Sequence, residues 1–416
     1  MQVNWSKLRE QIGLKVQVWQ RYRQARRKRS AQPLDLRADR LRVELATKLA
    51  WQALRRRRPL IWTNVWAPTE LLYALDCVPA SLEVYAAMLA SIEMTPCLCE
   101  VAEREGYGRD SCSLLRSALG AVLAGLFPPP QAVVCTSHLC DTGTKALYAA
   151  SVLAEAPFFL LEVPHQQSAE AEGFLAEQLR ELAASLAALL DRPFREERLR
   201  EALHLSNQAR AWLQKANELR RAIPAPMLGR SSLDYFYLMT MAFGHPETVT
   251  VYRTLYEELE GRVRKGFSPL GKERARILWL HQVRPYFPNN LLHHLEQELR
   301  VVVAFDEMGY VFWEELDPTD PFRSLARKLM ANHCLGPIER RVEAVLRMCR
   351  EYRVDGAVHF SQWGCRHSTG GIRFLKEALQ KEGLPLLSLD GDAADASQFS
   401  EGQIRTRLEA FVEVLL

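Results

Sequence analysis

The 416-residue sequence lacks a long hydrophobic run. Its longest apolar stretches, such as residues 118–127, fall well short of the roughly 20 residues that a membrane-spanning helix requires. No apolar segment of the kind found in secretory signal peptides follows Met1. The sequence therefore predicts a cytoplasmic protein with no membrane span.

Familiar cysteine spacings are also missing. The nine cysteines form neither the paired C-x-x-C motifs of structural zinc sites nor the closely spaced run of a ferredoxin. Their odd number and irregular spacing argue against a disulfide framework and favour reduced thiols. They stand at positions 77, 97, 99, 112, 135, 140, 334, 349 and 365.

Two nucleotide-binding loops are absent as well. The sequence has no G-x-x-x-x-G-K-[ST] loop and no G-x-G-x-x-G loop. Such glycine-rich loops place backbone N–H groups around phosphates. The chain is therefore not expected to be an ATPase of that kind.

Positive charge is concentrated at the N-terminus. Residues 1–58 hold 17 Lys and Arg against 4 Asp and Glu, whereas residues 59–416 hold 37 against 46. Because the arginines alternate with apolar positions of a helical pattern and no nucleic-acid-binding motif follows, we do not expect a nucleic-acid partner. A solvated helical face is the first interpretation. The second is a contact with the acidic remainder or with a partner subunit.

The length and the 48% hydrophobic content predict a globular chain of two or three domains. From Pro59, short apolar runs alternate with helical patterns, which is typical of an α/β domain with a parallel sheet. A helical stretch with a break at Pro193 interrupts this alternation, which then returns. We expect a basic helical segment at 1–58, a first α/β domain at 59–165, a helical insertion and linker at 166–270, and a second α/β domain at 271–416.

The two α/β halves repeat one pattern. Cys140 follows Val133 by seven residues, Cys365 follows Val358 by seven, and each cysteine lies between a predicted strand and a helix. Open parallel sheets bind ligands beyond the carboxyl ends of their strands. Two Rossmann-like or flavodoxin-like domains that face each other would therefore bring these cysteines to one site.

Cys112 shares this local setting, because it opens the helical pattern that begins at Ser113. The positive end of a helix stabilises a thiolate and any anionic group that the thiolate binds. A buried structural cysteine is the alternative for each of the three. Taken alone, the pattern predicts a metal or redox site.

Four segments are distinctive when taken together. They are Tyr-Gly-Arg-Asp-Ser-Cys-Ser-Leu-Leu-Arg at 107–116, Cys-Asp at 140–141, Trp-Gly-Cys at 363–365, and Arg-Thr-Arg-Leu-Glu-Ala-Phe at 405–411. In these segments the sequence resembles the 2-hydroxyacyl-CoA dehydratase and benzoyl-CoA reductase subunit family. The resemblance runs from about residue 59 to residue 416.

The resemblance implies a [4Fe–4S] cluster held by Cys112, Cys140 and Cys365 between two α/β domains, with one iron open to an acyl-CoA substrate. It implies a radical dehydration through a ketyl, started by an electron from a separate ATP-dependent iron–sulfur activator. It also implies a homologous subunit, in a homodimer or a heterodimer.

Membership of a second branch of the same family is the alternative assignment. Cys365 is followed by Arg366 and His367, which resembles members that bind a double-cubane 8Fe–9S cluster or reduce other substrates. The added thiolates would come from Cys97 and Cys99, or from Cys77 and Cys135. A benzoyl-CoA-type ATP-dependent reductase and a non-catalytic partner subunit of the same fold are the alternative functions.

Other polar side chains are candidates for the same site. Glu70 aligns with a Pro-x-Glu element of the family and is a candidate catalytic residue, with a first-turn helix carboxylate as the alternative. His138, between Cys135 and Cys140, is a candidate hydrogen-bond donor to a cluster or substrate. Arg116 faces either CoA or solvent. The remaining cysteines, Cys334 and Cys349, are expected in the core of helical segments.

Overall fold

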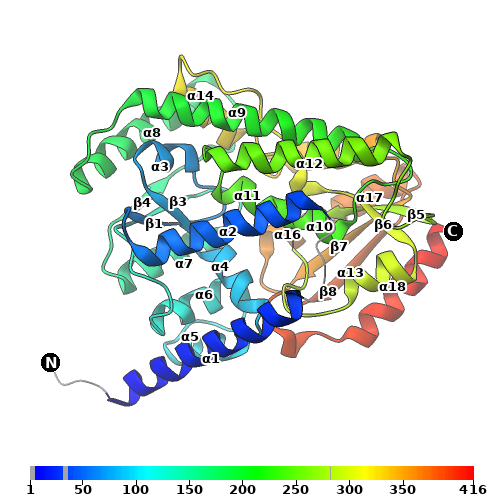
Figure 1. Ribbon diagram of the computed structural model, residues 1–416, viewed down its shortest axis with the longest axis horizontal. Coiled ribbons are helices and arrows are strands. Elements are labelled where there is room, and N and C mark those ends of the chain that lie inside the picture. Colours follow the sequence, from blue (N-terminus) through cyan, green and yellow to red (C-terminus); the bar gives the residue numbers. More distant parts are fainter. Residues whose placement is uncertain (1–4, 31–35, 282) are drawn as a thin grey trace.

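The chain folds into two parallel β-sheets with helices on their faces (Figure 1). The computed structural model describes residues 5–30, 36–281 and 283–416, with side chains described from residue 11 and not at 25–30. The first sheet has the strand order β2-β1-β3-β4, and the second has the order β6-β5-β7-β8. The strands are β1 (Leu60–Thr63), β2 (Val78–Ser81), β3 (Ala132–Thr136), β4 (Phe158–Leu161), β5 (Ala275–Leu280), β6 (Val301–Asp306), β7 (Gly356–Gln362) and β8 (Leu386–Gly391). The predicted fold class is confirmed.

The pattern that repeats in the sequence corresponds to equivalent strand pairing in the two sheets. Val133 of β3 pairs with Trp62 of β1, and Val358 of β7 pairs with Trp279 of β5. Both tryptophans are buried, and β1, β3, β5 and β7 are buried along their full length. Continuous apolar runs of this kind suit strands that are covered on both faces. The two halves therefore place the residues after β3 and β7 at equivalent positions.

Helices cover both sheets. In the first half they are α3 (Thr69–Ala74), α4 (Leu82–Ala90), α5 (Thr95–Arg104), α6 (Ser113–Leu123) and α7 (Asp141–Leu153). In the second half they are α13 (Leu291–His293), α15 (Ile338–Tyr352), α16 (Arg366–Gly370), α17 (Ile372–Lys381) and α18 (Glu401–Leu415), with the π-helical turn His294–Glu298 after α13. No helix among the described residues is long and apolar enough to cross a membrane.

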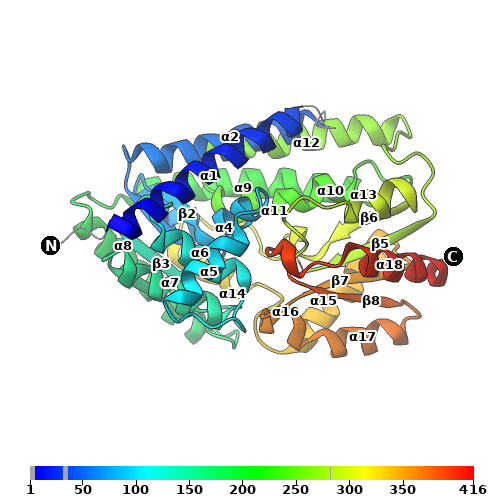
Figure 2. The same ribbon diagram turned by 90° about the horizontal axis from the view of Figure 1, so that it is seen from below.

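A helical layer joins the two halves. It contains α8 (Ala169–Leu189), α9 (Glu196–Leu219), α10 (Gly229–Ser232), α11 (Phe236–Met241), α12 (Pro246–Arg264) and α14 (Pro321–Met330). The predicted break at Pro193 is observed between α8 and α9. Ser206 on α9 bonds Glu70 of the first half, whereas Arg220 at the end of α9 pairs with Asp306 of the second at 3.2 Å. This layer therefore spans both domains (Figures 1 and 2).

The basic N-terminal segment forms α1 (Trp5–Ser30) and α2 (Arg37–Arg55). Helix α2 packs along α12, and Glu258 of α12 accepts the backbone N–H groups of Arg37 and Ala38 at 2.8 and 2.9 Å. Arg42 pairs with Asp234 at 3.1 Å, and Lys48 pairs with Glu247. These ion pairs favour the interpretation that the basic segment contacts acidic groups of the same chain.

Candidate functional site

The three singled-out cysteines occupy one kind of position. Cys112, Cys140 and Cys365 are the N-cap residues of α6, α7 and α16. The prediction that each opens a helix is confirmed. Cys140 accepts the backbone N–H of Gly143 at 3.2 Å, as a helix-capping side chain does.

The fold brings these three loops together. Gly364, just before Cys365, has φ +76°, and a Cβ added there would lie 2.7 Å from the backbone nitrogen of Cys112. The charged forms of Cys365 and Cys140 both disfavour ionisation of Cys112, which requires the sulfur atoms to be near one another. Loops of two sheets therefore converge at one place, where α16 lies at the domain boundary (Figure 2).

A buried hydrogen-bond network crosses the same boundary, and sequence reasoning missed it. Ser113, next to Cys112, donates its Oγ–H to Asp392 Oδ1 at 2.6 Å. Gln362 at the end of β7 donates its Nε2–H to Ser113 Oγ at 3.1 Å and accepts the N–H of Ala393. We call Ser113, Gln362 and Asp392 the domain latch. It fixes the start of α6 against the end of β7.

The three thiols are poor acids as they stand. Burial raises the pKa of Cys140 to about 11, against the effect of the Gly143 N–H. Burial also raises the pKa of Cys112 and of Cys365, and for Cys112 the neighbouring sulfur of Cys365 adds to the effect. A bound metal group would supply the positive charge that deprotonates such thiols. The donor set therefore suits a metal centre.

The three N-cap cysteines do not form a compact single-ion site among the described residues. Among the described residues, the group of ligand atoms that lies within 4.8 Å is formed by Glu307, His333 and Cys334, and it does not include the three N-cap cysteines. A single ion with thiolates at about 2.3 Å would hold its ligands within that range. Three cysteine thiolates are nevertheless the kind of donor that holds an iron–sulfur cluster.

A carboxyl group that sequence reasoning missed lies beside Cys140. Ser81 caps α4 and donates to Glu83 Oε2 at 3.0 Å. A Cβ added at Gly143 would lie 3.5 Å from Cys140 Sγ and 3.8 Å from Glu83 Oε1. Burial raises the pKa of Glu83 to about 7. Groups that titrate near neutrality can give and take protons during catalysis.

His138 and Glu70 have different surroundings. His138 is 2% exposed, its ring lies 5.9 Å from that of Trp66, and burial lowers its pKa to about 3. Glu70 is fully buried, accepts the Ser206 hydroxyl at 2.8 Å and pairs with Lys328 of α14. The contacts of Glu70 thus run to the helical layer, whereas His138 stays on the loop that leads to Cys140.

Arg116 does not face solvent, because its side chain is buried. Its guanidinium donates to the carbonyl oxygens of Arg109 and Ser111 at 2.7 and 2.8 Å and pairs with Glu103 at 3.2 Å. These bonds hold the loop before Cys112, so the role of Arg116 is to brace that loop.

The remaining cysteines do not converge. Cys97 and Cys99 stand two residues apart on α5, and their sulfurs bond the carbonyl oxygens of Met94 and Ser113, at 3.0 and 3.7 Å. Cys77 packs in the core between the first sheet and the helical layer, and Cys135 packs in a separate core of the first half. The accessory-ligand hypothesis stays a prediction. Cys349 lies in the core of α15, whereas the helical placement of Cys334 is wrong, because it lies in a turn.

Glu307, His333 and Cys334 form a second polar cluster beside Cys365. Arg341 donates to both carboxylate oxygens of Glu307, at 2.7 and 2.9 Å. Burial favours the protonated acid, but Arg341 outweighs it and holds the pKa of Glu307 well below its usual range. Because this guanidinium already neutralises the carboxylate, the cluster is better described as a buried ion pair than as a cation site.

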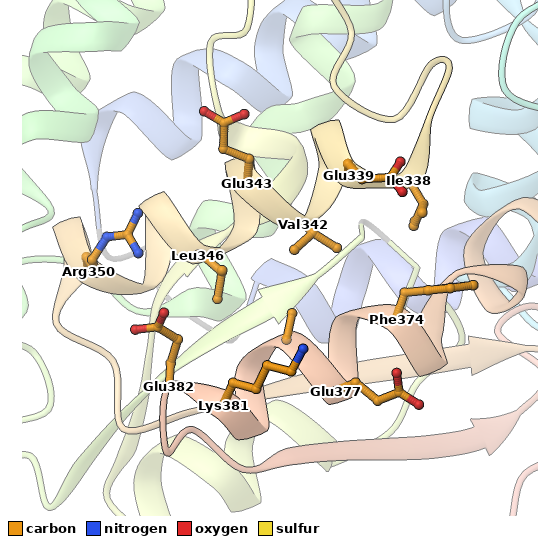
Figure 3. A pocket seen from close by; sticks show the side chains of 11 residues that line it. Ile338, Glu339, Val342, Glu343, Leu346, Arg350, Phe374, Glu377, Lys381 and Glu382 are labelled. Carbon is orange, nitrogen blue, oxygen red and sulfur yellow. The ribbon is translucent and has the colours of Figure 1, made fainter.

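A surface groove lies elsewhere, between α15 and α17 on the second half (Figure 3). It has an apolar floor and a charged rim, without a cysteine or histidine. Its lining residues are Ile338, Glu339, Val342, Glu343, Leu346, Arg350, Phe374, Glu377, Ala378, Lys381 and Glu382. The groove contains none of the predicted site residues.

Known proteins match this chain over most of its length. A family model described as "2-hydroxyglutaryl-CoA dehydratase, D-component" matches residues 64–415. The (R)-phenyllactyl-CoA dehydratase alpha subunit of Clostridium sporogenes is 26% identical, over 88% of this chain and 92% of its own. The (R)-2-hydroxyisocaproyl-CoA dehydratase alpha subunit of Clostridioides difficile is 25% identical, with the same two coverages. A benzoyl-CoA reductase subunit of Thauera aromatica is 24% identical, over 83% and 86%.

Proposed function

Because the chain belongs to the 2-hydroxyglutaryl-CoA dehydratase D-component family, we propose that it is the iron–sulfur subunit of a 2-hydroxyacyl-CoA dehydratase. One observation carries the proposal: three N-cap cysteines, on loops from both sheets, meet at the domain boundary. Cys112, Cys140 and Cys365 would hold a [4Fe–4S] cluster and leave one iron without a protein ligand.

Such a cluster, when bound, supplies a low-potential electron to the thioester carbonyl of the acyl-CoA. The protein provides the surroundings of that transfer. The N-termini of α6 and α7 point backbone N–H groups at Cys112 and Cys140, which stabilises anionic sulfur. Cys112 is buried and Cys140 is partly buried, which limits the access of water to the site.

Dehydration removes the hydroxyl group from C2 of the acyl chain and a proton from C3, so the site needs a group that moves protons. Glu83 is suited to this, because its carboxyl lies beside Cys140 and titrates near neutrality. His138, on the Cys140 loop, would position the substrate as a neutral hydrogen-bonding group. Glu70 supports the site indirectly, through the helical layer.

Partners follow from the same assignment. Relatives are named as alpha subunits, so a homologous second subunit is proposed. The electron would come from a separate ATP-hydrolysing activator, since this sequence has no P-loop. The proposed location is the cytoplasm.

Anaerobic reconstitution followed by iron and sulfide analysis tests the proposal. We expect about four irons per chain, as a single [4Fe–4S] cluster requires, and Cys365→Ala should lose them. The matched control is Cys349→Ala, which removes a core thiol of α15. Equal iron in both variants would overturn the ligand assignment.

A reductase is the second candidate, favoured by the match to a benzoyl-CoA reductase subunit and by Arg366 and His367 after Cys365. About eight irons per chain would indicate its double-cubane form. Substrate assays separate a single-cluster reductase from a dehydratase, because only the reductase consumes electrons in proportion to product.

A further inference from the structure

In the part of the chain that the structure describes, the two sheets have four edge strands, and three of these edges are protected. The strands β2 and β6 are buried along their full length, and β2 contains Pro79, which has no backbone N–H. Along β8, Arg407 donates to the carbonyl oxygen of Ser388 and pairs with Asp390 at 3.3 Å. Proteins protect their sheet edges in such ways, because the free N–H and C=O groups of an edge strand can pair with another chain.

The remaining edge strand, β4, lacks this protection (Figure 1). Its residues Phe158–Leu161 are Phe-Phe-Leu-Leu, without a proline or a charge. The carbonyl oxygens of Pro157 and Leu161 accept N–H groups from the side of β3. Because alternate residues of a strand bond to opposite sides, Phe158 and Leu160 direct their N–H and C=O groups outward. These outward groups form no hydrogen bond with the described residues.

The helix α8 shows that this edge accepts a partner. The next outward residue after Leu160 is Glu162, and Gln178 of α8 bonds both of its backbone groups. The side-chain oxygen of Gln178 accepts the Glu162 N–H at 2.8 Å, and its amide nitrogen donates to the Glu162 carbonyl oxygen at 3.0 Å. A side chain thus occupies the far end of the edge, and the open part is Phe158–Leu160.

Exposed apolar side chains lie around the open part of the edge. On α7, Tyr148, Val152 and Leu153 are 57%, 60% and 40% exposed, and on β4 Leu160 is 38% exposed. The ring of Tyr148 lies 5.4 Å from that of Phe158, so the helix and the strand form one surface. We call these five residues the β4 edge surface. Large apolar side chains that gather at one exposed place mark an interaction site.

The charge around this surface suits a second copy of the same chain. Residues 141–161 contain two acidic residues and one basic residue, so two copies would repel each other little. Helix α1 also exposes apolar side chains, such as Ile12 and Val16, but its described side chains at 11–24 include three basic residues and no acidic one. Two copies of α1 would therefore repel each other, whereas two copies of the β4 edge surface would not.

We propose that two copies of this chain associate through the β4 edge surface. The two β4 strands pair in an antiparallel manner across a two-fold axis, and α7 of each copy packs against α7 of the other. The first sheets of the two copies then form one continuous sheet. A two-fold contact uses the same surface on both copies, as an apolar strand edge with little charge allows.

This contact goes beyond the proposed function and leaves its site free. Cys140 caps the N-terminus of α7, whereas Tyr148, Val152 and Leu153 lie on the C-terminal half of that helix. The cysteine loops remain open to the substrate and to the electron donor in such a dimer.

Sedimentation velocity of the full chain under reducing conditions tests the contact. We expect the wild-type chain to sediment as a dimer. In Val152→Lys the lysines of the two copies meet near the axis, and the dissociation constant should rise at least about hundredfold. The matched control is Leu54→Lys on α2, because Leu54 is 57% exposed and lies outside the β4 edge surface. The control should stay dimeric.

A second variant removes a backbone donor of the strand. Leu160→Pro deletes the outward N–H, which no bond within the described chain uses, and edge strands tolerate proline. We expect this variant to lose the dimer as well. Thermal unfolding shows whether each variant is folded. If Leu160→Pro does not fold, Val152→Lys still tests the contact, because Val152 is largely exposed.

Hydrogen exchange at low and high protein concentration locates the contact. The amides of Phe158 and Leu160 should exchange more slowly at high concentration, and the amide of Ser388 on the protected β8 edge should not change. A chain that is monomeric at every concentration overturns the proposal. So does a dimer that survives Val152→Lys and leaves exchange in β4 unchanged. Neither result alters the iron content that tests the proposed function, so the two proposals fail independently.

Discussion

The two halves of the molecule use one scaffold to stabilise a buried sulfur in two ways. Cys140 caps the 13-residue helix α7 and accepts a backbone N–H from it. Cys365 occupies the equivalent place after β7, but α16 has five residues, and the Arg341 guanidinium acts on this thiol as well. Both sulfurs therefore face a backbone N–H of the helix that follows them, that of Gly143 or of Ser368, and the second half adds the charge of a buried guanidinium.

The difference extends to the polar groups around each sulfur. The first half places Glu83 at the carboxyl end of β2, beside Cys140. The second half places the Arg341 guanidinium near Cys365, and Arg341 in turn pairs with Glu307. A duplicated framework thus holds an asymmetric site, and the halves can be tested against each other.

Removing the ion pair should have the largest effect. Arg341→Met leaves the Glu307 carboxylate buried without its partner, and we expect the free energy of unfolding to fall by about 3–5 kcal/mol. Urea denaturation measures the loss. The double variant Arg341→Met/Glu307→Gln should recover much of it, because no unpaired charge remains. If the double variant is as unstable as the single one, the loss of stability comes from lost packing of the Arg341 side chain and not from an unpaired charge.

The contact between the halves should be the next most sensitive feature. Gly364→Ala adds a Cβ 2.7 Å from Cys112 N at φ +76°, and we expect a loss of about 2–4 kcal/mol together with a lower iron content. Gly383→Ala is the matched control, since φ is +73° there and no atom among the described residues lies within 4 Å of the added Cβ. The control should lose about 1 kcal/mol and keep its iron. Similar losses of stability in both variants would mean that backbone strain at positive φ, without the contact to Cys112, explains the effect of Gly364→Ala.

A buried carboxyl group in the second half gives a pH test. Glu296, before β6, accepts the N–H groups of Gly229 and Val303, at 2.6 and 3.4 Å, and burial raises its pKa to about 7. A pKa above that of the unfolded chain means that its stabilising effect is full below pH 4.5 and is lost as pH rises through 7. The loss is up to about 3 kcal/mol.

Thermal unfolding at several pH values measures this effect. Glu296→Gln should flatten the decline between pH 4.5 and 7 while keeping an acceptor for the Gly229 N–H. Glu83→Gln is the counterpart from the first half, and we expect it to lower dehydratase activity without lowering iron content. An unchanged decline in Glu296→Gln would assign the pH dependence to other groups.

Local patterns predicted the two sheets and the N-cap cysteines, because strand, loop and helix signals are contiguous in the sequence. The strand β2 escaped prediction, since Val78–Ser81 is four residues long and contains Pro79, which an edge strand tolerates. Without β2, Glu83 could not be recognised as a residue at a strand end. Its signal was the Ser81 cap at the end of that strand.

The rest of the site depends on long-range contacts. Cys112 and Cys365 are separated by 253 positions and belong to different halves, and only the packing of the two halves brings their loops together. Glu70 illustrates the reverse case. A family motif predicted that it is a catalytic carboxylate, but its contacts with Ser206 and Lys328 depend on how α9 and α14 pack. Sequence patterns indicate which residues are available, and packing decides their neighbours.

Disrupting the domain latch should give the smallest loss of stability and the effect most specific to the cysteine site. Ser113→Ala removes the hydroxyl that links Asp392 to Gln362, and we expect a loss of about 1 kcal/mol, because Asp392 keeps the N–H groups of Ala394 and Asp395. Ser117→Ala is the control, since its hydroxyl bonds Leu114 O within the same helix. If the latch positions Cys112 against Cys365, Ser113→Ala alone should also alter the electron paramagnetic resonance spectrum of the reduced cluster. Identical spectra would limit the latch to stability, and the two halves would then be held in register by the Gly364 contact.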